Sequence, residues 1–221
     1  MVKRLRQGYK RKERDSGKRH EKHVLLIAAE GKNKTETTYF RNFQRGNVSV
    51  KTISGNETSP GQLAERLIDE ADQLQLQSDD LAVCLVDSDF DSARDAELKR
   101  AEMKLQRKRK NHCPLELIVS SPCFEKWYIC HFSASSRNYN SNKDLLKDLE
   151  SYIPDYRKSD NIYPQYLQGK TKTAIVNAKR LEERCKSSGL RKHTVAFCPS
   201  TEVYKVFEDF LLKWLDPVES I

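Results

Sequence analysis

Short apolar runs recur along the first half of the chain and are separated by longer polar or amphipathic stretches. The runs that predict buried strands are residues 23–29, 48–53, 81–86 and 115–120. Apolar runs of this length are typical of parallel strands that are buried on both faces. Helices are predicted between them, over residues 36–45, 60–77 and 93–110. This order predicts an α/β fold, with a parallel sheet flanked by helices and right-handed crossovers.

The second half of the chain is predicted to be more helical. The predicted helices are residues 123–132, 143–152, 172–187 and 202–215. A short strand over residues 193–197 is expected to add to the sheet. We therefore expect a basic arm over residues 1–22 and one domain over residues 23–221, with its core at about 23–132 and a helical C-terminal elaboration.

The charge of the chain favours a polyanionic partner. Lys and Arg number 40 against 32 Asp and Glu, a net charge of +8, and residues 3–22 are dominated by Lys and Arg. Charge alone does not separate nucleic-acid binding from solubility, but its concentration in an arm favours nucleic acid. No apolar run is long enough to span a membrane, so a cytoplasmic protein without a membrane partner is expected. The six cysteines lack paired spacing, which disfavours disulfides and structural zinc.

Carboxylates follow two of the predicted strands. Glu30 comes directly after the first, and Asp87, Asp89 and Asp91 follow the strand over residues 81–86. Strand ends of a parallel sheet share one edge, where ligands bind. Magnesium prefers oxygen ligands and keeps several waters, so two or three carboxylates there suit Mg2+ or Mn2+. The alternative is an ordinary loop with Asp91 or Ser92 capping the next helix.

Glu125, near the start of the helix after the fourth strand, is a further candidate. It is either a metal ligand, a residue that orients the ligands, or a glutamate favoured by the helix dipole. Lys126 and Ser121 are weaker candidates. The lysines and arginines that we expect to contact nucleic acid are Lys32, Lys34, Arg107, Lys108, Arg109, Lys110, Lys170 and Lys172. For Lys32 and Lys34 a solvent-facing role is the more ordinary alternative.

The histidines and aromatic residues divide between core and surface roles. His131 is expected in the core, and so is the aromatic run of Trp127, Tyr128 and Phe132. His193, beside two basic residues, is a candidate for facing nucleic acid. The segment 163–166, which holds two tyrosines, is the better candidate for contacting bases.

Two motifs resemble those of the Toprim domain, a Rossmann-like fold shared by topoisomerases, primases and several nucleases. They are LLIAAEG at the first strand and CLVDSD at the third. The whole chain more closely resembles the RloB-like family of bacterial antiphage defence proteins. That resemblance rests on EGKNKTETTYF, VDSDFD, SSPCFEKWYICHF and PSTEVYKVFEDF, in this order, over roughly residues 23–212.

The resemblance implies a magnesium-dependent endonuclease. Glu30 would be the catalytic or metal-polarising glutamate, and Asp87 and Asp89 the magnesium ligands. It further implies abortive-infection defence, an ABC-type ATPase partner and an RNA target such as tRNA, although DNA stays open. The first motif has three residues between Gly31 and Thr35 where the shorter EGxTE form has one, which leaves the role of Glu36 in doubt.

A second reading is a non-catalytic nucleic-acid-binding or sensor subunit, in which the carboxylates are structural and the basic segments bind phosphates. A primase or topoisomerase would need further modules for which the chain has little room. The oligomeric state, homo-oligomer included, is left open by the sequence.

Overall fold

Five strands form one mixed sheet in the computed structural model of this chain, which describes residues 22–30, 35–53, 59–108 and 113–215. The strands are β1 (His23–Ala29), β2 (Val48–Thr52), β3 (Leu81–Asp87), β4 (Leu115–Ser121) and β5 (Ser200–Thr201). Their order is β2-β1-β3-β4-β5; the first four are parallel and β5 is antiparallel to β4. The four predicted parallel strands are confirmed, and the fold is α/β and Rossmann-like.

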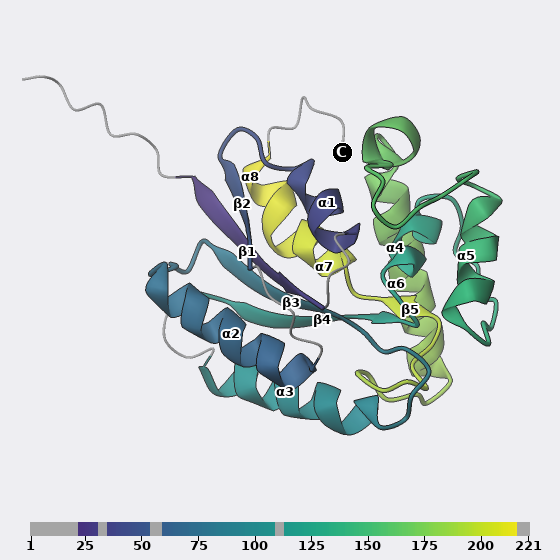
Figure 1. Cartoon of the computed structure of the whole chain (residues 1–221), viewed down its shortest axis with the longest axis horizontal. Helices are drawn as coiled ribbons and strands as arrows, with labels where there is room; N and C mark the ends of the chain where they lie inside the picture. Colours follow the sequence, from purple (N-terminus) through teal and green to yellow (C-terminus); the bar gives the residue numbers. More distant parts are fainter. Residues whose placement is uncertain (1–21, 31–34, 54–58, 109–112, 216–221) are drawn as a thin grey trace, which may run out of the picture.

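Helices cover both faces of the sheet (Figure 1). In the first half these are α1 (Thr35–Arg41), α2 (Pro60–Gln73) and α3 (Arg94–Lys108). In the second half they are α4 (Glu125–Cys130), α5 (Asn142–Glu150), the π-helical turn η1 (Tyr163–Leu167), α6 (Thr171–Ser187), α7 (Tyr204–Val206), η2 (Phe207–Leu211) and α8 (Leu212–Trp214). Each predicted helix is present with shifted ends, the one over residues 202–215 as α7, η2 and α8. No helix was predicted where η1 forms.

The sheet separates two hydrophobic cores because successive side chains of a strand point to opposite faces. Leu26 and Ala28 of β1 belong to the core beneath α2 and α3. Leu25 and Ile27 belong to the other core, beneath α1, α4 and the C-terminal helices. In Figure 1, α2 and α3 lie together on one side of the sheet, and α1 and α7 lie on the other. Both faces of β1 are therefore buried, as its unbroken apolar run predicted.

The strand expected at residues 193–197 was wrong. His193 has a φ of 56°, which is incompatible with an extended strand, and the segment after it forms turns. The Val195 N–H donates to Asp95 Oδ1 at 2.7 Å, so α3 takes the hydrogen bond that a strand neighbour would have made. The strand that extends the sheet is β5, at Ser200–Thr201.

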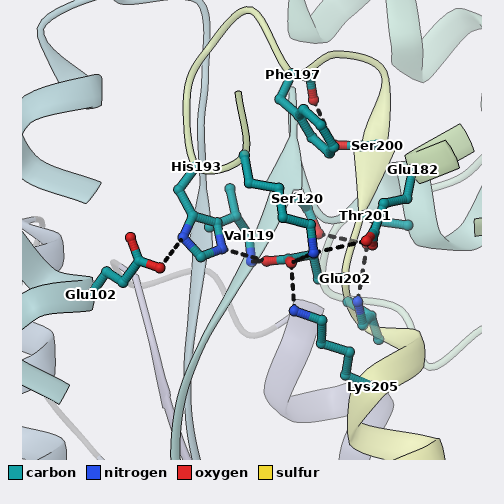
Figure 2. Close-up of polar contacts among 12 residues, drawn as sticks. Glu102, Val119, Ser120, Glu182, His193, Phe197, Ser200, Thr201, Glu202 and Lys205 are labelled. Atoms are coloured by element: carbon teal, nitrogen blue, oxygen red, sulfur yellow. Dashed lines mark hydrogen bonds and ion pairs between the residues drawn. The ribbon is translucent and has the colours of Figure 1, made fainter. Parts of the chain in front are cut away.

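A buried glutamate fixes this segment to the sheet (Figure 2). Glu202 is 2% exposed, and its Oε2 accepts from His193 Nε2 at 2.8 Å. Its Oε1 accepts from the ammonium groups of Lys192 and Lys205, at 2.9 and 2.6 Å. His193 Nδ1 also lies 3.2 Å from Glu102 of α3. His193 therefore bridges two carboxylates, and this structure does not support its expected contact with nucleic acid.

Burial and ion pairing oppose each other at this network. Burial would raise the pKa of Glu202, but the hydrogen bond and charge of His193, with Lys205 and Lys192, hold it well below its usual range. Burial would lower the pKa of His193, but Glu202 and Glu102 raise it. Both groups are thus held in their charged forms, as a hydrogen-bonded buried ion pair requires.

Most of the side chains that were expected in the core are buried. His131, Trp127 and Tyr128 are buried, as expected, while Phe132 is half-buried. Tyr163 is only 4% exposed, so the base contact expected of it was wrong. All six cysteines are free thiols. Within the residues that the structure describes, none of the helices has the length and apolar character needed to cross a membrane.

Candidate carboxylate site

Three neighbouring strands bring carboxylates to one edge of the sheet. Glu30 directly follows β1, Asp87 is the last residue of β3, and Glu125 begins α4 just after β4. The register aligns these ends, because Ala29 pairs with Leu85 and Asp87 pairs with Ser120. The predicted gathering of acidic residues at the carboxyl ends of the strands is therefore what the parallel topology produces.

The turn after β3 is fixed to the end of β4. The Ser88 N–H donates to Ser120 O at 2.9 Å, and the Ser88 hydroxyl donates to the Ser121 hydroxyl at 2.7 Å. The Asp89 N–H donates to Pro122 O at 3.0 Å. Asp89 has a φ of 51°, a left-handed conformation that aspartate tolerates better than most residues. The turn thus presents Asp89 from a defined backbone position.

Arg94, the first residue of α3, binds several of these groups. Its Nη2 donates to both carboxylate oxygens of Glu30, at 2.5 and 2.6 Å, and to the backbone oxygen of Asp87 at 2.9 Å. The same nitrogen lies 3.8 Å from Asp89 Oδ2, and Nη1 lies 3.5 Å from Glu97. The guanidinium therefore lies among acidic groups as a local counter-charge.

Glu36 and Glu125 extend the cluster away from Arg94. Both are buried, at 8% and 1% exposure. Glu125 Oε1 accepts a hydrogen bond from the Tyr156 hydroxyl at 3.2 Å and lies 3.4 Å from Lys158 Nζ. The backbone oxygen of Lys158 accepts from the hydroxyl of Thr35, which joins the 151–161 loop to α1. Glu36 Oε2 is buried without a hydrogen-bond partner among the described residues.

The acidic groups perturb one another. Burial raises the pKa of Glu30 to about 7, against the lowering effect of Arg94. Burial, with Glu125 and Glu30, also raises the pKa of Glu36 to about 7. The pKa of Asp87 lies well above its usual range because of burial and the charges of Glu36, Glu125, Asp89 and Glu30. Carboxyl groups in this condition take up protons near neutral pH unless a cation stabilises their charged forms.

The donor set fits Mg2+ or Mn2+, because every candidate ligand is a carboxylate oxygen and the buried Glu36 Oε2 lacks a partner. Glu30, Asp87 and Asp89 do not, however, form a compact trio. Among the described residues, only the ligating atoms of His23, Asp79 and Asp80 all lie within 4.8 Å of one another. That group lies at the start of β1, at the opposite end of the strand from Glu30. Both carboxylate oxygens of Asp80 accept hydrogen bonds there, from the N–H groups of Val24 and Gln77. Its role there is structural.

Several predicted site residues lie elsewhere. Asp91 is exposed, and its Oδ1 accepts from the Ala93 N–H at 2.9 Å, so its side chain belongs to the start of α3. Arg107 and Lys108 are at the last turn of α3, which starts at the site with Arg94; fifteen helical residues place them roughly 20 Å away. The candidates outside the described residues are Lys32, Lys34, Arg109 and Lys110.

Lys170 and the weaker candidate Lys126 are engaged with other groups. Lys170 Nζ lies 4.4 Å from the centre of the Phe132 ring and donates to the Tyr166 backbone oxygen. Lys172, near the start of α6, is exposed. Lys126 is fully buried and donates to the Ser135 backbone oxygen at 2.6 Å.

The sequence did not single out Arg94 or Lys158, and it left Glu36 in doubt. A glutamate in the first turn of a helix is ordinary, so Glu36 gave little signal. Lys158 is in a loop more than thirty residues from Glu125, the carboxylate it contacts. The basic residue Arg94, five positions after Asp89, was the one accessible clue in the sequence.

Fold and site together define an α/β protein with an acidic cluster at the carboxyl ends of parallel strands. The chain belongs to the RloB-like protein family, whose model matches residues 25–210. The match covers the sheet, the acidic cluster and the helices up to η2, which confirms the family resemblance drawn from the motifs. No curated protein and no solved structure matches the chain.

Proposed function

We propose that this protein is a metal-dependent endonuclease of the Toprim type, which hydrolyses phosphodiester bonds in RNA, such as tRNA, or in DNA. The observation that supports this most directly is the buried acidic cluster, in which Glu36 Oε2 lacks a partner and Asp87 is surrounded by other carboxylates. Such a cluster is costly to fold unless a cation neutralises it. Its place at the carboxyl edge of a parallel sheet is where substrates of such folds bind.

The residues of the cluster would have different roles, in binding the cation and in binding the substrate. Asp87 and Asp89, held by the turn on β4, would bind the cation together with Glu30. Bound there, the metal would activate water and stabilise the charge that develops on the phosphate oxygens. Glu36 and Glu125, whose charges act on Asp87, would supply further carboxylate oxygens to the cation. Lys158, 38% exposed beside Glu125, is placed to attract a phosphate oxygen of the substrate.

The wider role is proposed from the family alone. RloB-like membership is consistent with antiphage defence in the cytoplasm beside an ABC-type ATPase. The net charge of +8 and the basic arm favour a nucleic-acid substrate. Neither observation selects RNA over DNA.

The deciding experiment is a cleavage assay with the purified full chain on total RNA, single-stranded DNA and duplex DNA, with Mg2+, Mn2+ or EDTA. The Asp87→Asn variant removes the central carboxylate with little change of shape. Asp69→Asn, on the exposed face of α2, removes one equal charge away from the site. We expect metal-dependent cleavage by the wild type and Asp69→Asn, and loss of at least a hundredfold in Asp87→Asn.

Cleavage that survives in Asp87→Asn would refute the proposed site. Nucleic-acid binding without cleavage, unchanged by Asp87→Asn and by EDTA, would instead support the non-catalytic binding or sensor subunit.

A further inference from the structure

Phe90 has an unusual environment for an aromatic residue in this protein. Its side chain is 40% exposed, and it is the only exposed Phe, Tyr or Trp among residues 22–30, 35–53, 59–108 and 113–215. Most of the other aromatic rings pack into one core, in contacts that centre on Tyr39. Phe90 belongs to neither hydrophobic core. Two fifths of its surface is therefore left exposed outside both cores.

The position of Phe90 relates it to the candidate site. It directly follows Asp89 and is three residues from Asp87, within the turn that β4 holds by backbone hydrogen bonds. Asn142 Nδ2 also donates to Asp89 Oδ1 at 3.2 Å, which joins the same turn to α5. Adjacent Cα atoms are about 3.8 Å apart, so the ring is attached beside the acidic cluster.

We propose that Phe90 is a stacking platform for an unpaired base next to the phosphate held at the carboxylate site, which makes the substrate a nucleic acid with unpaired nucleotides. This inference rests on the proposed function, since the phosphate at the acidic cluster places the base. It deepens that function by naming the structural class of the substrate, while RNA and DNA share the chemistry of stacking.

The charges around the ring favour a base as its partner. Asp89 and Asp91 flank Phe90, so a phosphate would be repelled there unless a cation intervened. The face of a nucleobase is uncharged and stacks on an aromatic ring regardless of sequence. In a duplex each base face is covered by its neighbours, so an aromatic side chain reaches it only when the nucleotide is unstacked. Phe90 would thus bind unpaired nucleotides in preference to a duplex.

The sequence predicted base contacts at residues 163–166, but the two tyrosines of that segment are not exposed in the structure. Tyr163 is buried against Tyr39 and Phe43, with ring centres 5.6 and 5.0 Å apart. Tyr166 is half-buried and packs against the same core. Phe90 is the aromatic side chain that the described structure leaves accessible.

The test measures binding by the full chain to a fluorescein-labelled single strand and to the same sequence as a duplex, in RNA and DNA versions. Ca2+ replaces Mg2+, and gels verify that the strands stay intact. The variants are Phe90→Ala, Phe90→Leu and Phe90→Tyr. Met103→Ala is the matched control, because Met103 is an apolar side chain of α3 with 43% exposure.

We expect Phe90→Ala and Phe90→Leu to weaken single-strand binding about tenfold or more, because a stacked base contributes a factor of this size. Phe90→Tyr keeps the ring and should retain affinity, and Met103→Ala should match the wild type. Duplex affinity should be equal in all variants. Unchanged single-strand binding in Phe90→Ala, full binding in Phe90→Leu, or an equal loss for duplex would each overturn the inference.

The outcome is separable from that of the cleavage assay. Metal-dependent cleavage with no effect of Phe90→Ala on binding would refute the stacking role and leave the nuclease proposal standing. A ring requirement for single-strand binding without any cleavage would support stacking and refute the nuclease.

Discussion

The guanidinium of Arg94 binds both carboxylate oxygens of Glu30, at 2.5 and 2.6 Å. These are the two oxygens with which Glu30 would bind a metal ion. The two side chains are only 13% and 19% exposed, so solvent screens this pair weakly. Arg94 and a divalent cation are therefore expected to compete for Glu30.

Replacing Arg94 tests this competition. Arg94→Gln should lower the free energy of unfolding in EDTA by about 1–3 kcal/mol, because it leaves a partly buried carboxylate without its counter-charge. The same variant should bind Mn2+ several-fold more tightly, measured by isothermal titration calorimetry. Arg100→Gln, further along α3, is the control. Weaker Mn2+ binding in Arg94→Gln would mean that Arg94 supports the metal site.

Neutralising Glu36 should stabilise the metal-free protein. Its buried Oε2 has no partner among the described residues, and Glu125 and Glu30 lie near enough to raise its pKa. At about pH 8 in EDTA, Glu36→Gln should raise the free energy of unfolding by about 1–3 kcal/mol. Thermal unfolding with and without Mg2+ measures this. The gain should disappear in Mg2+, since the variant loses a ligand; a loss of stability in EDTA would contradict the assignment.

The His193 network predicts a pH dependence of stability with a definite sign. The pKa of His193 is raised in the folded protein, so its stabilisation is fully present below the ordinary value of 6.5 and is lost as the pH rises through the folded value. The pKa of Glu202 is lowered, so its contribution is present above 4.5 and lost only in strong acid. The ion pair is therefore strongest in mildly acidic solution.

His193→Gln should consequently cost about 1–2 kcal/mol of unfolding free energy near pH 6 and clearly less near pH 9, measured by urea unfolding at both values. Lys192→Gln removes another partner of Glu202. Burial would lower the pKa of the Lys192 ammonium, but Glu202 and Glu182 raise it, so this group stays charged at both pH values. The cost of Lys192→Gln should change little over this range. Equal costs for His193→Gln at both values would show that the imidazole is not charged.

Removal of residues 1–20 tests the basic arm, which lies outside the described residues. The truncated chain should bind nucleic acid more weakly and with a shallower dependence of affinity on salt, because fewer counterions are released. Titrations between roughly 50 and 200 mM salt measure both. The metal requirement for cleavage should be unchanged. Equal affinity and equal salt slope would exclude a binding role for the arm.

The parts of the fold that could be predicted from sequence are those that local patterns specify. Residues 24–29 and 81–86 are apolar throughout, and a strand of a parallel sheet with helices on both faces buries such a run on both sides. Glu30 and Asp87 then reach the same edge by topology alone. At residues 193–197 the pattern was misleading, because His193 takes a left-handed conformation to reach Glu202.

The sequence by itself determined the α/β class, the buried parallel strands and the edge at which the acidic residues gather. The tertiary structure alone decided which charges meet there. Arg94 is 64 residues from Glu30 in the sequence, and Lys158 reaches Glu125 from the loop that follows α5. Hydrophobic periodicity is a local property that a strand or helix shows on its own, whereas an ion pair depends on how separate elements pack, which no local pattern encodes.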